Sequence, residues 1–174
     1  VREIVTNILK EHAVDTVCFV GCGGSLSGFF PAKYFLSCEA KKLKVGYINA
    51  NEFVHATPKE IGANAVVILA SQRGDTAETV KACRAANEKG AATVGLTFQV
   101  PSPLADSAQH VILYEFGDDS IVENQKTSYG FKMALELLHQ IEGYAGYDAM
   151  VKALGSLNEI VVKAKKDIVP FAIK

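Results

Sequence analysis

The most constraining feature of this sequence is a purely apolar run that ends in a turn rich in Ser, Thr and Gly. The run, residues 65–69, is short and β-branched, as expected of a strand buried on both faces of a sheet. Residues 71–79 follow it and lead into a helical pattern over 75–89. Such a turn places backbone N–H groups and hydroxyls at the positive end of a helix dipole. It therefore predicts an anion site, and we expect the anion to be a phosphate.

Strand-like and helix-like segments alternate along most of the chain. Strands are expected at 17–20, 44–48, 65–69, 93–97 and 110–114, and helices at 4–13, 27–36, 49–55, 75–89, 121–142 and 148–166. Five strands alternating with helices predict an α/β fold, a three-layer αβα sandwich whose parallel sheet is flanked by helices. In the flavodoxin-like strand order 2-1-3-4-5, the winding direction reverses between the first and third strands, and ligands bind at such a switch point.

A second glycine-rich turn, residues 21–28, follows the first strand and would lie beside the turn at 71–79. It does not match the dinucleotide fingerprint, because Leu26 stands where that motif requires Gly or Ala. The sequence also lacks the G-x-x-x-x-G-K-[ST] motif of P-loop nucleotide-binding proteins. Two interpretations remain: a small phosphate site, or Ser and Thr side chains that only cap helices.

The number of donors favours the phosphate site, because capping accounts for only one hydroxyl per helix. Arg73 adds a positive charge, whereas Asp75 and Glu78 would repel a phosphate and are expected to point away from it. The cluster comprises Ser71, Gly74, Thr76 and Thr79 opposite Gly23, Gly24 and Ser25. Glu123 and Lys126 open the next long helix, either as ordinary helix-start residues or as groups at the sugar.

Composition limits the other function classes. A net charge of -1, with 21% charged residues, gives no bulk electrostatic case for nucleic acid or a membrane surface. No apolar run approaches the roughly 20 residues of a membrane span, so we expect a cytoplasmic protein. The four Cys and four His lack the spacing of metal ligands. We therefore expect no metal and no cofactor.

Three motifs, in this order, resemble a sugar isomerase (SIS) domain: residues 22–25 after one strand, 71–79 after another, and 123–127 at a helix start. Other segments look most like the fructosamine 6-phosphate deglycases, including fructose-asparagine 6-phosphate deglycase. These segments are 30–33, 49–53, 102–104, 116–118 and 142–144. The resemblance implies that Gly23, Gly24, Ser25, Ser71, Gln72 and Thr76 bind the phosphate. Many family members carry Ser where this chain has Arg73, so Gln72 is expected to act mainly through its backbone.

The resemblance also implies a domain organisation. Family members typically contain two SIS domains, with the proposed catalytic Glu and His in the second. Residues 1–174 would then be a single SIS domain, the first of two, and no residue here can be assigned as the catalytic acid or base. Apolar helices at both ends predict packing against another such domain in a homodimer or larger assembly.

The leading hypothesis is a phosphosugar isomerase or deglycase that acts on a fructosamine 6-phosphate. The expected phosphate and sugar ligands are Gly23, Gly24, Ser25, Ser71, Gln72, Arg73, Thr76 and Glu123. One alternative is the isomerase half of a glucosamine 6-phosphate synthase. Another is a sensor domain of a transcription regulator, which would bind a phosphosugar without turnover.

Overall fold

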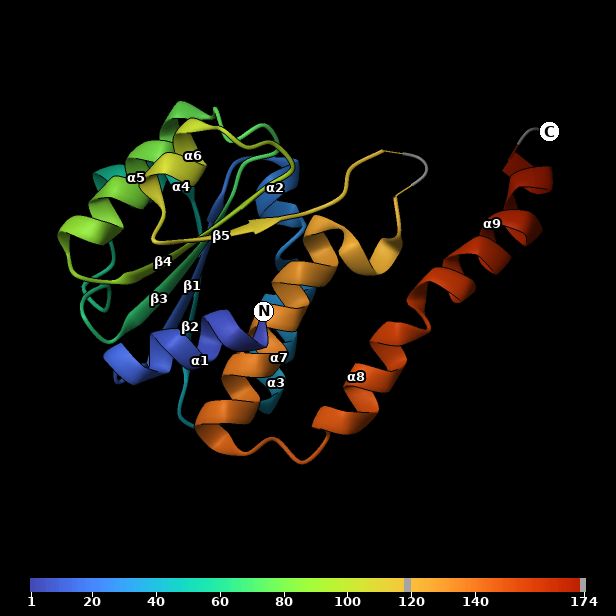
Figure 1. The fold of residues 1–174 in the computed structure, drawn as a ribbon, viewed down its shortest axis with the longest axis horizontal. Coiled ribbons are helices and arrows are strands. Elements are labelled where there is room, and N and C mark those ends of the chain that lie inside the picture. Colours follow the sequence, from blue (N-terminus) through green and yellow to red (C-terminus); the bar gives the residue numbers. More distant parts are fainter. Residues whose placement is uncertain (118–119, 173–174) are drawn as a thin grey trace.

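A five-stranded parallel sheet forms the centre of the molecule (Figure 1). The computed structural model describes residues 1–117 and 120–172. The strand order is β2-β1-β3-β4-β5, and every neighbouring pair is parallel, which confirms the predicted sheet. The strands are β1 (Thr16–Gly21), β2 (Lys44–Asn49), β3 (Ala65–Ala70), β4 (Ala92–Thr97) and β5 (His110–Leu113).

Helices cover both faces of the sheet, so the three layers are those of the predicted sandwich. One layer contains α1 (Arg2–Glu11), α3 (Phe30–Glu39) and α7 (Lys126–Glu142), and the other contains α4 (Ala50–His55), α5 (Ala77–Glu88) and α6 (Pro103–Ser107). The two layers explain why β3 is apolar throughout. Val66 and Ile68 belong to the core under α3 and α7, whereas Val67 and Leu69 belong to the core under α4 and α5.

The helix expected at 27–36 is α3, which begins three residues later than predicted, at Phe30. α2 (Gly24–Ser27) ends before α3 begins, and Pro31 lies in the first turn of α3. Phe29 lies between them, fully buried, with its ring centroid 5.2 Å from that of Phe19. α7 packs directly on this ring, because a Cβ at Gly130 would lie 2.7 Å from Phe29 Cδ1. Phe29 is thus buried at the junction of α2 and α3, where Gly28 and Phe29 keep helical dihedral angles.

Two other predicted helices also differ from the structure. The helix expected at 121–142 is instead a short 3₁₀ helix, η1 (Val122–Asn124), followed by α7. The helix expected at 148–166 is divided at Ser156 into α8 (Tyr147–Gly155) and α9 (Leu157–Ala172). Apolar periodicity does not show where such a helical run is interrupted. Asp118 and Asp119, expected in the loop before the long helix, lie outside the described residues.

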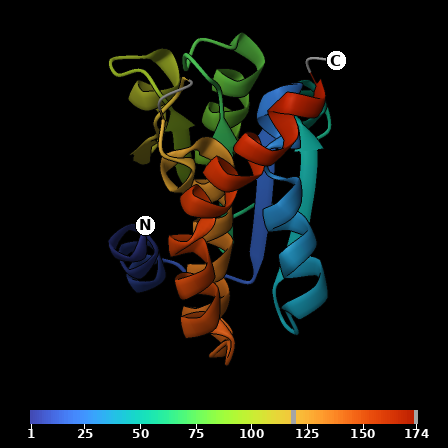
Figure 2. The same ribbon diagram turned by 90° about the vertical axis from the view of Figure 1, so that its right-hand side faces the viewer.

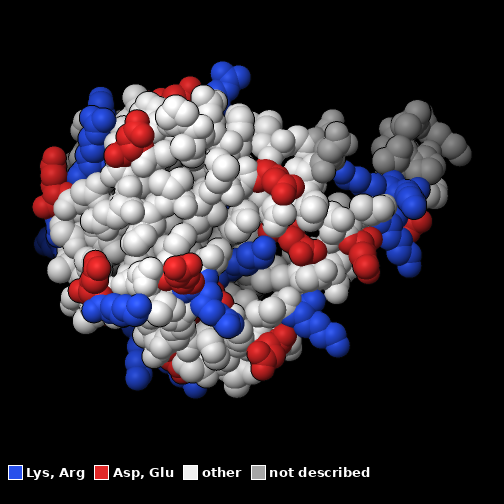
Figure 3. All heavy atoms as spheres, viewed as in Figure 1, with Lys and Arg blue, Asp and Glu red and all other residues white. Residues whose placement is uncertain are grey.

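Helices α8 and α9 form an arm that extends from the body of the protein (Figure 1), and in Figure 2 this arm faces the viewer. Several large apolar side chains on this arm are exposed: Val151, Ile160, Val162, Ile168 and Phe171. Positive and negative side chains are interspersed over the body in the view of Figure 3. Within the described residues, no helix combines the length and hydrophobicity needed to cross a membrane.

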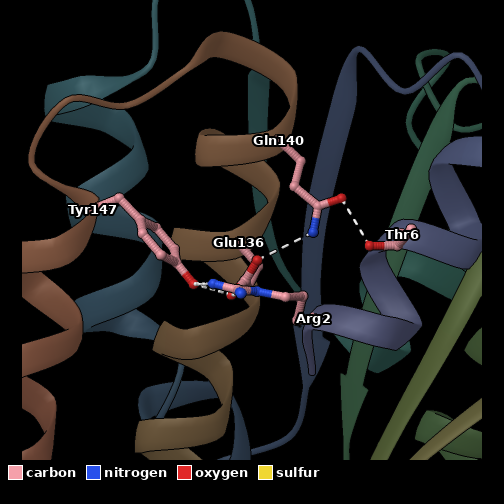
Figure 4. Close-up of polar contacts among 5 residues, drawn as sticks. All are labelled: Arg2, Thr6, Glu136, Gln140 and Tyr147. Atoms are coloured by element: carbon pink, nitrogen blue, oxygen red, sulfur yellow. Dashed lines mark hydrogen bonds and ion pairs between the residues drawn. The ribbon is translucent and has the colours of Figure 1, made fainter.

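A polar cluster fixes the start of the arm to the body (Figure 4). The Tyr147 hydroxyl, from α8, donates a short hydrogen bond to the buried carboxylate of Glu136 on α7. Arg2 Nη2 donates to the Tyr147 hydroxyl at 2.6 Å, and Arg2 Nε lies 3.3 Å from Glu136 Oε1. Burial acts to raise the pKa of Glu136, but hydrogen bonds from Tyr147, Gln140 and Arg2 outweigh it and leave this pKa lowered. Glu136 therefore remains a carboxylate that joins α1, α7 and α8.

We expect Tyr147→Phe to destabilise the protein, because it leaves the buried Glu136 carboxylate without its nearest donor. The loss in the free energy of unfolding should be about 1–3 kcal/mol, measured by urea denaturation. Tyr34→Phe is the matched control, since Tyr34 is 60% exposed. Equal stabilities of the two variants would contradict the assigned role of the cluster.

Candidate functional site

The two predicted turns lie side by side at the carboxyl edge of the sheet. β1 pairs with β3 so that Gly21 is opposite Ala70, and the chain therefore leaves both strands at the same level. The turn after β1 leads into α2, and the turn after β3 leads into α5. The strand order thus places both turns at the switch point, where the sequence predicted a shared crevice.

The turn after β3 is held together by its own polar groups. Ser71 is buried, and its Oγ lies 2.9 Å from Thr76 Oγ1 and accepts a hydrogen bond from the Thr76 N–H at 3.3 Å. The Gly74 N–H donates to the Ser71 carbonyl at 3.1 Å. These bonds fix the positions of both hydroxyls before any ligand binds.

Backbone donors around the turns are left without protein acceptors. Among the described residues, the N–H groups of Gln72, Arg73 and Asp75 have no such partner. The first N–H groups of any helix have no acceptor within the helix. In α5 they also receive no cap, because the side chain of the N-cap residue Thr76 accepts no hydrogen bond from them. Gly23, the N-cap residue of α2, likewise supplies no side-chain cap. The capping interpretation is therefore weaker than the anion-site interpretation.

Both turns line one open pocket of about 470 Å³. Its charges are the cations Arg73 and Lys126 and the carboxylate of Asp75. Asp75 was expected to point away from the ligand, yet it lies in the pocket wall. Two cations against one carboxylate still favour an anion. The described lining consists of Cys22, Gly24, Ser25, Gln72, Arg73, Asp75, Thr76 and Lys126.

Lys126 joins the start of α7 to the first turn. Its Nζ donates to the Gly24 carbonyl at 2.9 Å, and the half-buried ammonium has a pKa lowered by burial. The side chain passes over Gly28, where an added Cβ would lie 2.8 Å from Lys126 Cε. The sequence left the role of Lys126 open, because this contact joins residues about 100 positions apart. The glycine at position 28 leaves room for such a contact, but a glycine in the sequence does not show which side chain will pack over it.

The predicted Gln72 and Glu123 occupy different surroundings. The Gln72 carbonyl accepts from Thr97 Oγ1 and from the Phe98 N–H, both at 3.1 Å, so its free N–H and exposed side chain are the groups available to a ligand. Glu123 is not brought to the phosphate pocket. It lines a separate pocket with Glu136 and Tyr147, and its carbonyl accepts from Lys132 Nζ at 2.6 Å.

No metal-binding group is evident in the part of the chain that the structure describes. Within residues 1–117 and 120–172, His, Cys, Asp and Glu side chains do not gather in threes or more at distances suited to a shared ion. The site consists instead of hydroxyls, backbone N–H groups, two cations and the Asp75 carboxylate. These groups can hold an anion but do not form a proton-transfer pair.

The SIS domain family model matches residues 12–140. The chain belongs to the SIS domain family. Both turns and Lys126 fall within the matched residues, so the candidate phosphate site lies inside the SIS domain.

Individual relatives of this SIS domain agree with the family. It is 38% identical to the fructosamine deglycase FrlB of Bacillus subtilis over 91% of this chain and 48% of that protein. It is 27% identical to an isomerizing glutamine–fructose-6-phosphate aminotransferase of Methanothermobacter thermautotrophicus, over 95% of this chain and 27% of that protein.

A solved structure from Salmonella typhimurium LT2, provisionally described as a phosphosugar isomerase, superposes with a TM-score of 0.95. It is 52% identical, and the match covers 96% of this chain and 51% of that one. The SIS domain therefore has the fold of this neighbour. It spans about half the length of the Bacillus and Salmonella proteins.

Gly74→Ala should destabilise the SIS domain, because Gly74 has φ +73° and an added Cβ would overlap the side chain of Ser102. We expect the free energy of unfolding to fall by about 3 kcal/mol in urea denaturation. Gly155→Ala is the control, since a Cβ there meets nothing within 4 Å. A Gly74→Ala protein as stable as wild type would show that the turn tolerates a side chain.

Proposed function

We propose that this chain is the phosphosugar-binding domain of an enzyme that acts on fructosamine 6-phosphates as a deglycase. The observation that carries the proposal is the pocket in which unpaired N–H groups, Thr76 and Lys126 converge, with the buried Ser71 hydroxyl behind it holding the Thr76 hydroxyl in place. These groups suit a phosphate monoester, which accepts several hydrogen bonds and carries negative charge. The likeness to FrlB supports a fructosamine as the sugar.

The phosphate would anchor the substrate while the chemistry takes place at its other end. Deglycation requires an open-chain sugar and proton transfers between C1 and C2 before water releases the amine. Anchoring the remote phosphate contributes by holding C1 and C2 in place for these transfers. We assign the catalytic acid and base to a second SIS domain of the parent protein, since the described residues of the phosphate pocket do not form a proton-transfer pair.

Association with another SIS domain is part of this proposal. The exposed apolar residues of the arm, including Ile160, Ile168 and Phe171, provide a surface that association would cover. We propose a homodimer or a larger homo-oligomer.

We expect Thr76→Val to weaken the binding of fructose 6-phosphate at least tenfold, because the side chain keeps its shape but loses the hydroxyl. Isothermal titration calorimetry on the full-length protein measures this change. Thr76→Ser retains the hydroxyl and serves as the control, with an expected change of less than about threefold. The double variant Ser71→Ala/Thr76→Ala should lose measurable binding, and unchanged affinity would refute the phosphate site.

Turnover distinguishes the deglycase from the alternatives. The full-length protein should convert a fructosamine 6-phosphate and water into a hexose 6-phosphate and the free amine, detected by an amine assay and phosphosugar chromatography. Formation of glucosamine 6-phosphate only with glutamine and fructose 6-phosphate would instead support the aminotransferase, which the 27% identical relative favours. Tight binding without turnover would support a sensor domain.

A further inference from the structure

The sheet has an open edge at β2. Among the described residues no strand lies beyond β2, and its six residues are all at least partly exposed, whereas β1, β3 and β4 are buried at every position. β2 is the cyan strand at the right of Figure 2. The opposite edge, β5, is only four residues long. β2 is therefore the longer of the two edges to which another strand can be added.

Alternate residues of β2 direct their backbone groups away from the sheet. The Lys44 N–H donates to the Asp15 carbonyl at 2.9 Å, which lies on the side of β1. Because this direction alternates along a strand, the N–H and C=O groups of Val45, Tyr47 and Asn49 face outward. No strand of the described part of the chain lies on that side to pair with them.

β2 lacks most of the features that usually protect an exposed edge. Its register with β1 is continuous over all six residues, so it has no bulge, and its sequence contains no proline. The one charged residue in the strand is Lys44, at its start, where the ammonium lies 3.3 Å from the Asp15 carboxylate. The remaining residues, 45–49, are uncharged. Nothing in this strand opposes pairing with another strand.

An aromatic cluster lies beside this edge, on the side of the sheet that α3 covers. Phe30 and Tyr34 of α3 are 54% and 60% exposed, and their rings stack with centroids 6.3 Å apart. Phe30 also packs edge-on against Tyr47 of β2, with centroids 6.3 Å apart. The Tyr47 hydroxyl donates to the Leu26 carbonyl at 3.0 Å, which holds this ring in place. The outward-facing backbone groups of β2 are therefore flanked by a fixed apolar surface.

The charges at the two ends of β2 complement each other. Residues 41–44 include three exposed lysines, which outnumber the two carboxylates that bond to this segment. Glu52 is exposed just after the end of the strand. Lys42 and Glu52 each lie five positions from Tyr47. An antiparallel copy of β2 centred on Tyr47 therefore brings the Glu52 of each copy to the Lys42 of the other.

We propose that β2 is an interface between two copies of this chain, whose β2 strands pair antiparallel across a two-fold axis at Tyr47. An axis perpendicular to the sheet keeps α3 of both copies on one face, so the two aromatic clusters become continuous. In this register Val45 lies opposite Asn49 of the partner subunit. Both residues face outward, so such pairs exchange N–H···O hydrogen bonds. The two sheets become one, and neither copy keeps an open edge at β2.

This interface is separate from the arm. α8 packs against α7, and α9 packs against η1, on the other side of the α3–α7 layer from the sheet. Two different two-fold interfaces in one protein produce a tetramer, so association through the arm is compatible with pairing at β2. The inference does not depend on the phosphate site, and loss of phosphate binding would leave it intact.

Charge reversal in the full-length protein tests the pairing. Lys42→Glu and Glu52→Lys each place like charges at both ends of the paired strands, because the two-fold axis repeats every contact. Each variant should raise the dissociation constant of the assembly about tenfold or more in sedimentation-velocity experiments. The double variant Lys42→Glu/Glu52→Lys should restore it to within about threefold of wild type.

The matched control is Lys59→Glu, which reverses an exposed charge in the loop between α4 and β3, away from this edge. It should leave the assembly unchanged. Single variants that assemble like wild type, or a double variant as weak as the single ones, would overturn the proposed pairing.

Hydrogen exchange tests where the copies meet. In the wild-type assembly the N–H groups of Val45, Tyr47 and Asn49 should exchange about tenfold more slowly than in the single variants at concentrations where these dissociate, because pairing supplies acceptors. Mass spectrometry of peptides that span 44–49 measures this difference. Fast exchange in the wild-type assembly would show that the edge stays open. Protection that persists in the dissociated variants would show that another segment covers it. Either result would refute an interface at β2.

Discussion

The pairing of β1 with β3 is the constraint on which the site depends. Chain order would place β2 beside β3, but β1 lies between them, and Gly21 is in register with Ala70. A Cβ at Gly21 would lie 3.0 Å from Leu26 N and 3.2 Å from the Ala70 carbonyl oxygen. The first turn therefore folds closely over the end of β3, and a larger residue at 21 would push the two turns apart. The crevice is a consequence of strand order and of this close contact.

Within that crevice, groups that are already held in place contribute more to anion binding than charges on mobile side chains. Arg73 is exposed, and an exposed side chain loses rotamer freedom when it binds a ligand. Lys126 is half-buried and already bonded to the Gly24 carbonyl, and the Ser71–Thr76 pair is bonded internally. Preorganised donors of this kind cost little reorganisation when an anion binds. Lys126 is thus better placed than Arg73 to offset the repulsion from Asp75.

The sequence was sufficient for the sheet, because a strand buried on both faces is apolar at every position and β3 is such a strand. It was also sufficient to bring the turns at 21–28 and 71–79 together, since strand order decides their proximity. The sequence did not predict the helix boundaries correctly where packing against a distant segment decides the local geometry. Phe29, at the junction of α2 and α3, is buried against Gly130, and that contact joins segments about 100 residues apart.

The same limitation applies to the site residues. Lys126 reaches the phosphate pocket because Gly28 leaves space for its side chain, whereas Glu123, only three residues earlier, lies in η1. The change from a 3₁₀ helix to α7 between them turns the two side chains towards different pockets. A continuous helix, as predicted, would keep residues three apart on one face. Glu123 was expected at the sugar because it opens the long helix near the same edge of the sheet, and the sequence does not show the break that turns it away.

α7 links the site to the arm. It begins with Lys126 at the phosphate pocket and carries Glu136, ten residues later and about 15 Å along the helix axis, in the cluster that holds Tyr147. Between these points α7 packs on Phe29, at the junction of α2 and α3. Because one continuous helix makes all three contacts, a shift of the arm that moved α7 would also move Lys126 relative to Gly24. The polar cluster in Figure 4 therefore does more than stabilise the fold, because it fixes the helix that positions a cation in the candidate site.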